Sequence, residues 1–333
     1  MIYRQLLYIA LCLVLISCQT KTKTTQAEVR CVFSADSAYS YIDKQVSFGP
    51  RVPGTEAHSM CGDWLVGELL RHGAQVEEQS GVMLNYAGEK QDIRNISAVL
   101  KGSTLQAILL CAHWDCRPWS DEEEDYEQRF QPVLGANDGA SGVGVILEIV
   151  RQLADLKSQG KPIPTIQVVF FDCEDMGTPT HYTGKERLDT WCLGSQLWAK
   201  EYAVTKAEKT ADQLPIQYGI LLDMVGDASA TFPCEYFSMQ YASGYVENMW
   251  RTAAKLGYAR YFVRQSTYYP ITDDHYYVNT IAGIPCLDVI DYKADTKTGF
   301  SSWWHTQRDD MQNINKQTLQ AVGETVMTTI CSR

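Results

Sequence analysis

The sequence predicts a single α/β domain in which an open central β-sheet is flanked by helices. Short apolar runs of the kind found in strands buried on both faces recur along the chain, and segments with helical spacing separate them. Polar and mostly acidic residues follow these runs directly. No interior linker or internal repeat divides the 333 residues, so one domain is the economical interpretation.

The composition limits the classes of partner. The apolar fraction of 45% is normal for a soluble globular protein. The formal charge of −11 argues against nucleic acid and against an anionic membrane surface as partners. Many aromatic residues, 8 Trp and 19 Tyr, are present, and several stand beside candidate site residues. They fit an apolar pocket as well as they fit core packing.

The N-terminus predicts a targeting segment. Arg4 precedes an apolar run, Leu6 to Ile16, which is too short to span a bilayer. The run ends in Leu15-Ile16-Ser17-Cys18, which is similar to the lipobox of a bacterial lipoprotein. An ordinary secretory signal in which Cys18 is incidental is the alternative.

We therefore expect three segments along the chain. Residues 1–17 form the signal peptide, residues 18–30 a flexible tether that begins at the lipidated Cys18, and residues 31–333 the folded domain. This organisation places the protein in the bacterial cell envelope, lipid-anchored on the periplasmic or the surface side.

The 11 cysteines show no regular spacing that would support a disulfide framework or a thiolate zinc site. Cys111, Cys173 and Cys286 stand in apolar strand-like runs. We interpret them as small buried hydrophobic residues.

The N-terminal part of the domain predicts two helices and then strands. Helical spacing indicates a helix over Ser34 to Val46, and Thr55 is a suitable N-cap for a second helix that ends at His72. His58 and His72 have no acidic or thiol partner in register on that helix, so we interpret them as surface or packing residues. Strands are expected over Ala74–Ser80, Val82–Tyr86 and Ile93–Leu100.

The next strand, Ala107 to Ala112, is apolar throughout and ends in His113-Trp114-Asp115. An imidazole and a carboxylate thus follow a strand, at the sheet edge where open α/β folds bind ligands. A structural His–Asp pair is the alternative. The acidic run Ser120 to Glu127 is expected to be a solvated loop, because its spacing matches no calcium-binding loop.

A turn of small residues, Gly135 to Gly142, opens a predicted helix that continues to about Leu156. Asp138 stands at the helix start, where an N-cap would explain it. An N-cap would not by itself require the surrounding glycines, which let the backbone approach another group closely.

The stretch Thr165 to Gly177 organises the rest of the chain. Its apolar run, Ile166 to Phe171, ends in the acids Asp172, Glu174 and Asp175. Neighbouring side chains of an extended chain point in opposite directions, so one of Glu174 and Asp175 could hold a metal while the other acts as a base. A solvated acidic turn explains these residues equally well when they are taken alone.

The C-terminal half continues the alternation of helices and strands. We expect helices over Leu193–Tyr202, Gly244–Leu256 and Asn313–Ile330, and strands over Tyr218–Met224 and Cys286–Ile290. Two irregular segments are long: Thr178 to Trp191, and the stretch after Ile290 that reaches Trp303-Trp304-His305-Thr306.

Asp138, Asp175 and His305 form the sharpest candidate constellation. Two carboxylates and one imidazole are ligands suited to zinc, and three protein ligands leave one coordination position open. An open position is typical of a catalytic metal site rather than a structural one.

At this point the chain resembles a known family. The ordered motifs His113-x-Asp115, Gly135-Ala136-Asn137-Asp138, Phe170 to Asp175, Leu221-Leu222-Asp223 and Trp304-His305-Thr306 are similar to those of the zinc aminopeptidase superfamily. The run Asp273-Asp274-His275 and the Trp before the metal histidine are similar to its glutaminyl-peptide cyclotransferase branch, the animal-type glutaminyl cyclases. The resemblance covers nearly the whole chain after Cys31. It implies the zinc aminopeptidase-like fold, with a mixed and mostly parallel central sheet flanked by helices.

The resemblance also implies roles for residues. Zinc would be held by Asp138, Asp175 and His305, one ion per chain. Glu174 aligns with the general acid/base, and Asp223 and Asp273 align with two acids near the substrate. Trp304 aligns with the pocket aromatic beside the metal. Three departures stand out: the second pocket Trp is missing after the acidic pair, where Trp191 is the candidate substitute; Asp288 replaces a histidine; and Asp175 replaces a glutamate.

The implied activity is zinc-assisted cyclisation of N-terminal glutamine to pyroglutamate, with release of ammonia, on peptides or proteins and by a monomer. The alternative enzyme is an aminopeptidase with two zinc ions, in which His113 and Asp223 are also ligands and Asp138 bridges. A lipid-tethered module that only captures peptide termini is the non-enzymatic alternative.

Overall fold

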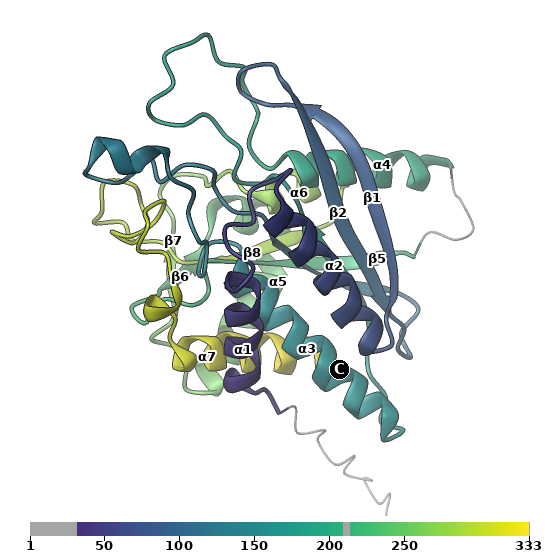
Figure 1. The fold of residues 1–333 in the computed structure, drawn as a ribbon. Helices are drawn as coiled ribbons and strands as arrows, with labels where there is room; N and C mark the ends of the chain where they lie inside the picture. Colours follow the sequence, from purple (N-terminus) through teal and green to yellow (C-terminus); the bar gives the residue numbers. More distant parts are fainter. Residues whose placement is uncertain (1–31, 209–213, 333) are drawn as a thin grey trace, which may run out of the picture. The chain divides into compact units, whose positions relative to one another are not determined.

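The structure is a computed structural model that describes residues 32–208 and 214–332. A mixed sheet with the strand order β1-β2-β4-β3-β5-β8 forms its centre (Figure 1). The strands are β1 Gln75–Leu84, β2 Lys90–Leu100, β3 Ala107–His113, β4 Thr165–Phe171, β5 Ile216–Asp223 and β8 Cys286–Ile290. Pairs β3–β4, β3–β5 and β5–β8 are parallel, whereas β1–β2 and β2–β4 are antiparallel. The predicted α/β fold with a mixed, mostly parallel sheet is confirmed.

Helices cover both faces of this sheet (Figure 1). On one face α3 packs against β3 and β5, and α1 and α7 pack against α3; on the other face α4 and α6 pack against each other and against the strands. The helices are α1 Ala35–Val46, α2 Glu56–Arg71, α3 Ala140–Ser158, α4 Leu193–Glu208, α5 Tyr236–Lys255, α6 Asp274–Thr280 and α7 Lys316–Cys331. Smaller elements are the two-stranded sheet of β6 Phe232–Cys234 and β7 Phe262–Ser266, and the 3₁₀ turns η1 Tyr126–Phe130 and η2 Met311–Asn313.

The buried strands carry apolar side chains to both layers of helices, as their sequences predict. Leu109, Phe171 and Leu221 join Trp198 of α4 and Val278 of α6 in one core cluster. On the opposite face α3 lies very close to the sheet. A Cβ atom at Gly142 would come within 2.0 Å of the carbonyl oxygen of Leu222, so only glycine permits this approach.

Both N-terminal helices begin where predicted. The side chains of Ser34 and Thr55 accept backbone N–H groups as N-caps of α1 and α2. The strand prediction that follows is wrong in one respect, because β1 is continuous where we expected a break at Gly81. Gly81 pairs with Ile93, and a Cβ atom there would lie 2.5 Å from Leu197, so this glycine marks close packing rather than a turn.

Three further features differ from the sequence analysis. Helix α5 starts at Tyr236 instead of Gly244, with a non-helical residue at Ala242. Helix α6 and the short β6–β7 pair are not expected from periodicity. Seven cysteines in the described part of the chain are free thiols: Cys61, Cys111, Cys116, Cys173, Cys192, Cys234 and Cys286.

The predicted signal peptide, Cys18 and tether lie outside the described residues. Within residues 32–208 and 214–332, no helix has both the length and the apolar character needed to cross a membrane.

Candidate metal centre and its pocket

The carboxyl ends of three parallel strands supply most of the predicted site residues. His113 is the last residue of β3, Asp223 is the last residue of β5, and Glu174 and Asp175 follow β4 after a short turn. Parallel strands end at the same sheet edge, so these side chains are brought together. Two loops complete the group, with Asp138 before α3 and His305 between β8 and α7.

Asp138, Asp175 and His305 meet as the sequence predicts. Nε2 of His305 lies 3.2 Å from Oδ1 of Asp175 and 3.5 Å from Oδ2 of Asp138, and all three residues are buried. A tetrahedral zinc ion with bonds of about 2.0–2.1 Å sets its ligand atoms roughly 3.3 Å apart. Both spacings from His305 therefore fit a shared zinc ion, and the three ligand atoms all lie within 4.8 Å of one another.

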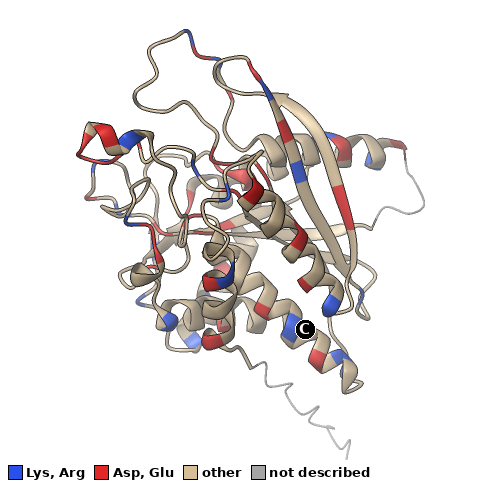
Figure 2. Ribbon diagram, viewed as in Figure 1, with Lys and Arg blue, Asp and Glu red and all other residues tan. Residues whose placement is uncertain are grey.

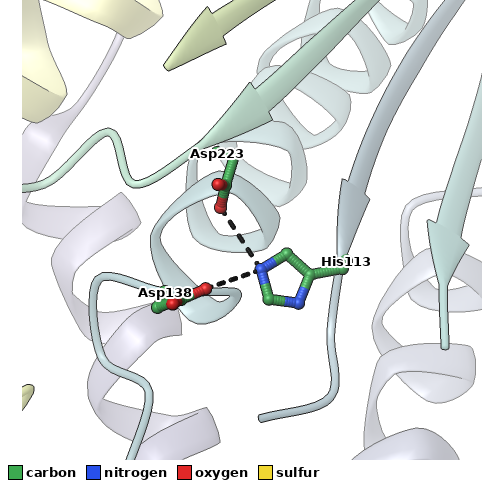
Figure 3. Close-up of side chains that lie close together, drawn as sticks. All are labelled: His113, Asp138 and Asp223. Atoms are coloured by element: carbon green, nitrogen blue, oxygen red, sulfur yellow. Dashed lines mark hydrogen bonds and ion pairs between the residues drawn. The ribbon is translucent and has the colours of Figure 1, made fainter. Parts of the chain in front are cut away.

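A second group shares Asp138. Nε2 of His113 lies between the carboxylates of Asp138 and Asp223, 2.9 Å from Oδ1 of the former and 3.2 Å from Oδ1 of the latter (Figure 3). One oxygen of Asp138 thus faces His113 and the other faces His305. This arrangement could hold a second ion with Asp138 as the bridge, or a proton on His113.

Both imidazoles are oriented by a carboxylate on the far side of the ring. Nδ1 of His113 lies 3.4 Å from Asp115, and Nδ1 of His305 lies 3.6 Å from Asp121. A carboxylate behind a histidine fixes the ring and raises its basicity, and this outer contact is typical of metal-ligating histidines.

Arg117 is a member of the site that the sequence analysis missed. Its buried guanidinium donates two hydrogen bonds of 2.7 Å to Asp121 and one of 3.1 Å to Oδ1 of Asp175. The predicted solvated loop is therefore wrong at Asp121, which is buried because the guanidinium neutralises it. Burial lowers the pKa of Arg117, but these two acids outweigh that effect and raise it.

Two further acids hold the backbone of the metal ligands. Asp309 accepts the N–H groups of Asn137 and Asp138, and Asp115 accepts those of Glu174 and Asp175. Helix α3 has Gly139 as its N-cap residue and no side-chain cap. The N-cap interpretation of Asp138 is therefore wrong, and its carboxylate contacts the two imidazoles instead.

The site holds more carboxylates than cationic groups. Elsewhere Asp and Glu lie on helices, in loops and on the outer strands β1 and β2 (Figure 2). Burial, with the charges of Asp138 and Asp273, raises the pKa of Asp223 to about 7. Burial would lower the pKa of His305, but Asp175 and neighbouring acids raise it to about 10. A bound cation would neutralise this excess of negative charge, which agrees with the ligand spacing.

Two indoles lie nearly parallel to the imidazole of His305. Trp304 stacks on it with ring centroids 3.4 Å apart, and Trp191 lies parallel to it at 6.4 Å. Trp191 itself lies over Gly177, where a Cβ atom would come within 1.9 Å of the indole, and the guanidinium of Arg117 lies 4.9 Å from its ring centre. The candidate substitute for the second pocket Trp is therefore placed beside the metal triad.

Glu174 is half-buried and is not a member of the triad's ligand set. The thiol of Cys192 donates a hydrogen bond of 3.1 Å to its Oε1. Burial, together with the charges of Asp175 and Asp273, raises the pKa of Glu174 well above its ordinary value, although His113 opposes this. Cys192 is a second residue that the sequence analysis missed, because no motif distinguishes it from a buried cysteine.

Asp273 begins helix α6 and lies within 4.8 Å of both Glu174 and Cys192, counted between possible ligand atoms. Behind it, Asp288 is fully buried with an oxygen 3.6 Å from Nδ1 of His275. Asp288, where the resemblance implies a histidine, thus lies in a buried group with Asp273 and His275.

Four residues of the site adopt the left-handed backbone conformation without being glycine: Cys173 (φ 54°), Cys192 (φ 55°), Met224 (φ 49°) and His305 (φ 54°). Each conformation of this kind costs on the order of 1–3 kcal/mol, and such residues concentrate at functional sites. The turn after β4, the turn after β5 and the loop of His305 are therefore held by their surroundings in the geometry described above.

Comparison with known proteins agrees with this geometry. Residues 95–330 match the profile of peptidase family M28. The chain is 47% identical to Tannerella forsythia glutaminyl cyclase, with a TM-score of 0.84 over 91% of this chain and 99% of that one. It is 46% identical to a Zn-dependent exopeptidase from Parabacteroides distasonis, with a TM-score of 0.82 over 90% and 99% of the two chains.

A curated relative is more distant. Aminopeptidase YwaD of Bacillus subtilis (strain 168) is 26% identical over 298 residues, which make up 88% of this chain. The alignment spans 56% of the length of that relative.

Proposed function

The chain belongs to peptidase family M28, and within this zinc-dependent family we propose that it is a glutaminyl-peptide cyclotransferase. Its substrates would be peptides or proteins with N-terminal glutamine, and its products pyroglutamate and ammonia. The observation that carries the proposal is the pair of indoles, Trp304 and Trp191, that stack near the imidazole of His305. Aromatic walls exclude water from the site, which favours closure of a lactam over hydrolysis to glutamate.

Asp138, Asp175 and His305 would hold one zinc ion. When bound, the ion supplies a positive charge that polarises the carbonyl of the substrate's side-chain amide. The indoles confine that side chain, so the α-amino group and the amide carbon meet within one residue and orientation provides much of the rate.

Glu174 would transfer the proton. Its carboxylate accepts a proton from the α-ammonium group, and the freed amine forms a bond to the amide carbon. Glu174 then returns its proton to the amide nitrogen, the bond from the amide carbon to that nitrogen breaks, and ammonia leaves. The ring nitrogen gives up its second proton to solvent, which leaves the neutral lactam. The raised pKa of Glu174 suits a group that both accepts and donates a proton near neutral pH.

Asp273 and Asp223 would support the leaving group. Asp273 lies within reach of Glu174, and its charge contributes to the raised pKa of Asp223. Two close acids in a buried site rarely both stay charged, so a shared proton here could hydrogen-bond the departing nitrogen.

The test is ammonia release from a Gln-initiated dipeptide by zinc-loaded protein, beside a leucine-anilide control. We expect release of ammonia and no cleavage of the anilide. Glu174→Gln should retain zinc and lose nearly all turnover, whereas Glu77→Gln, at an exposed position of β1, should match the unmodified chain. Substantial turnover by Glu174→Gln would remove that residue from its role.

A two-zinc aminopeptidase is the second candidate, and the contacts of His113 with Asp138 and Asp223 favour it (Figure 3). Metal analysis read together with the products separates the two candidates. About two zinc ions per chain support the aminopeptidase only when free amino acids are released and Cys192→Ser keeps the same zinc content.

We further propose that the enzyme acts as a monomer and that Cys18 carries a lipid anchor at the bacterial cell envelope. The lipobox-like sequence before Cys18 supports the anchor.

A further inference from the structure

Three side chains beside the metal triad form a group of their own. Glu174, Cys192 and Asp273 each offer one possible ligand atom, and these atoms all lie within 4.8 Å of one another. Sγ of Cys192 lies 3.1 Å from Oε1 of Glu174. None of the three belongs to the Asp138, Asp175 and His305 set.

We propose that Glu174, Cys192 and Asp273 form an additional, inhibitory site for a thiophilic divalent cation such as zinc. A thiolate and two carboxylates are established zinc ligands, with Zn–S of about 2.3 Å and Zn–O of about 2.0–2.2 Å. Tetrahedral coordination with these bonds sets sulfur and oxygen roughly 3.5 Å apart, so only a small side-chain movement separates the observed contact from a shared ion.

A separate observation at Asp273 points to a ligand. Its Oδ1 accepts the backbone N–H of Asp274, but its Oδ2 is buried and has no hydrogen-bond partner among the described residues. The residue is only 3% exposed. A buried acceptor without a partner is costly, and a cation bound at this position would satisfy it.

The thiol explains why the site would select a soft metal. Burial and the charge of Glu174 raise the pKa of Cys192 well above its ordinary value, so the free protein keeps the proton on sulfur. A zinc or cobalt ion displaces that proton, because a coordinating thiol is deprotonated by the metal. Glu174 is half-buried, so solvent reaches one of the three groups.

A cation bound at this site would engage the carboxylates of Glu174 and Asp273, so neither could contact the substrate. Excess zinc would then compete with the N-terminal glutamine and inhibit an enzyme that needs zinc at its triad. The inhibitory effect rests on the proposed role of Glu174, whereas binding of the cation at Cys192 does not.

Cobalt titration of the metal-free, full-length protein tests the site without reference to activity. We expect cobalt to fill the triad of oxygen and nitrogen ligands first, which produces absorption bands in the visible range only. Further cobalt should then produce the near-ultraviolet absorption of a thiolate–cobalt bond. This absorption should be absent in Cys192→Ser and Cys192→Ala and retained in Cys234→Ser, a matched change at a half-buried cysteine. Circular dichroism of each variant checks its fold.

Two spectroscopic outcomes would overturn the site: no thiolate absorption with excess cobalt, or absorption that persists in folded Cys192→Ser.

Zinc inhibition is measured as the rate in excess zinc divided by the rate of the same variant when zinc fills only the triad. Loss of an outer contact to a metal ligand weakens metal binding by at least roughly 10-fold. Cys192→Ser removes a direct ligand, so inhibitory zinc should bind this variant at least roughly 10-fold more weakly. Equal inhibition of the unmodified chain and Cys192→Ser would overturn the inhibitory role.

The cobalt spectra and the ammonia-release assay together distinguish failure of the additional metal site from failure of the proposed function. A thiolate signal that depends on Cys192, in protein that releases no ammonia from Gln-peptides, would support the site and contradict the cyclase. Ammonia release without that signal would support the cyclase and contradict the site.

Discussion

Replacing Arg117 with methionine tests whether one buried guanidinium holds the metal ligands in place. The fork of Arg117 neutralises Asp121, which in turn lies behind His305, and a third bond reaches Asp175. Methionine fills similar space without charge. The substitution therefore leaves two buried carboxylates without their main cationic partner.

The structure sets the expected magnitude. Removing one partner of a buried ion pair costs about 3–5 kcal/mol, because the remaining charge stays buried. Loss of an outer-shell contact to a metal ligand weakens metal binding by roughly 10–100-fold. We therefore expect Arg117→Met to lose about 3–5 kcal/mol of unfolding free energy and to bind zinc at least roughly 10-fold more weakly.

Urea unfolding of metal-free protein measures the first quantity, and competition with a zinc chelator measures the second. Arg117→Lys keeps the charge but cannot form the fork, so an intermediate loss is expected. Arg264→Met, at an exposed arginine, should stay within about 0.5 kcal/mol of the unmodified chain. A loss below about 1 kcal/mol for Arg117→Met, or zinc affinity equal to that of the unmodified chain, would refute the reasoning.

Three further predictions follow from the site and the N-terminus. Asp273→Asn should lower kcat more than it raises KM in steady-state kinetics on a Gln-dipeptide, and a pure KM defect would contradict a role in proton sharing. In metal-free protein the folded pKa of His305, about 10, exceeds its unfolded value of 6.5. Its stabilising contribution is therefore complete below pH 6.5 and is lost as pH rises to 10. Melting temperature against pH should show this loss in the unmodified chain, and an equal slope in His305→Gln would count against it. Finally, Cys18→Ser should abolish incorporation of labelled fatty acid in a bacterial host, and retained label would place the lipid elsewhere.

Much of the fold could be predicted from local sequence. The strands β3, β4, β5 and β8 are continuous apolar runs, and only a sheet covered on both faces buries such runs. The prediction was wrong where a long-range contact decides. Gly81 looks like a strand break until Leu197, more than a hundred residues later, is placed against it. The short helix α6 has too few turns to show an apolar period.

Some residues of the candidate site could likewise be predicted from the sequence, and others could not. Asp138, Asp175 and His305 could be predicted because acids after strands share a sheet edge and because the ordered motifs resemble a family. Arg117 and Cys192 could not, since each acts through a contact across the fold and neither lies in a recognisable spacing. Asp121 was misread for the same reason: an acidic run gives no sign that one of its members faces a buried guanidinium.

The contact between Gly177 and the indole of Trp191 offers a handle for redesign. The ring occupies the volume that any side chain at position 177 would need, with 1.9 Å between a Cβ atom and the indole. Gly177→Ala would thus displace the indole of Trp191 without replacing any charged residue of the site. A single added methyl group thereby tests whether bulkier N-terminal residues are accepted once the indole beside His305 has moved, and how far selectivity depends on its position.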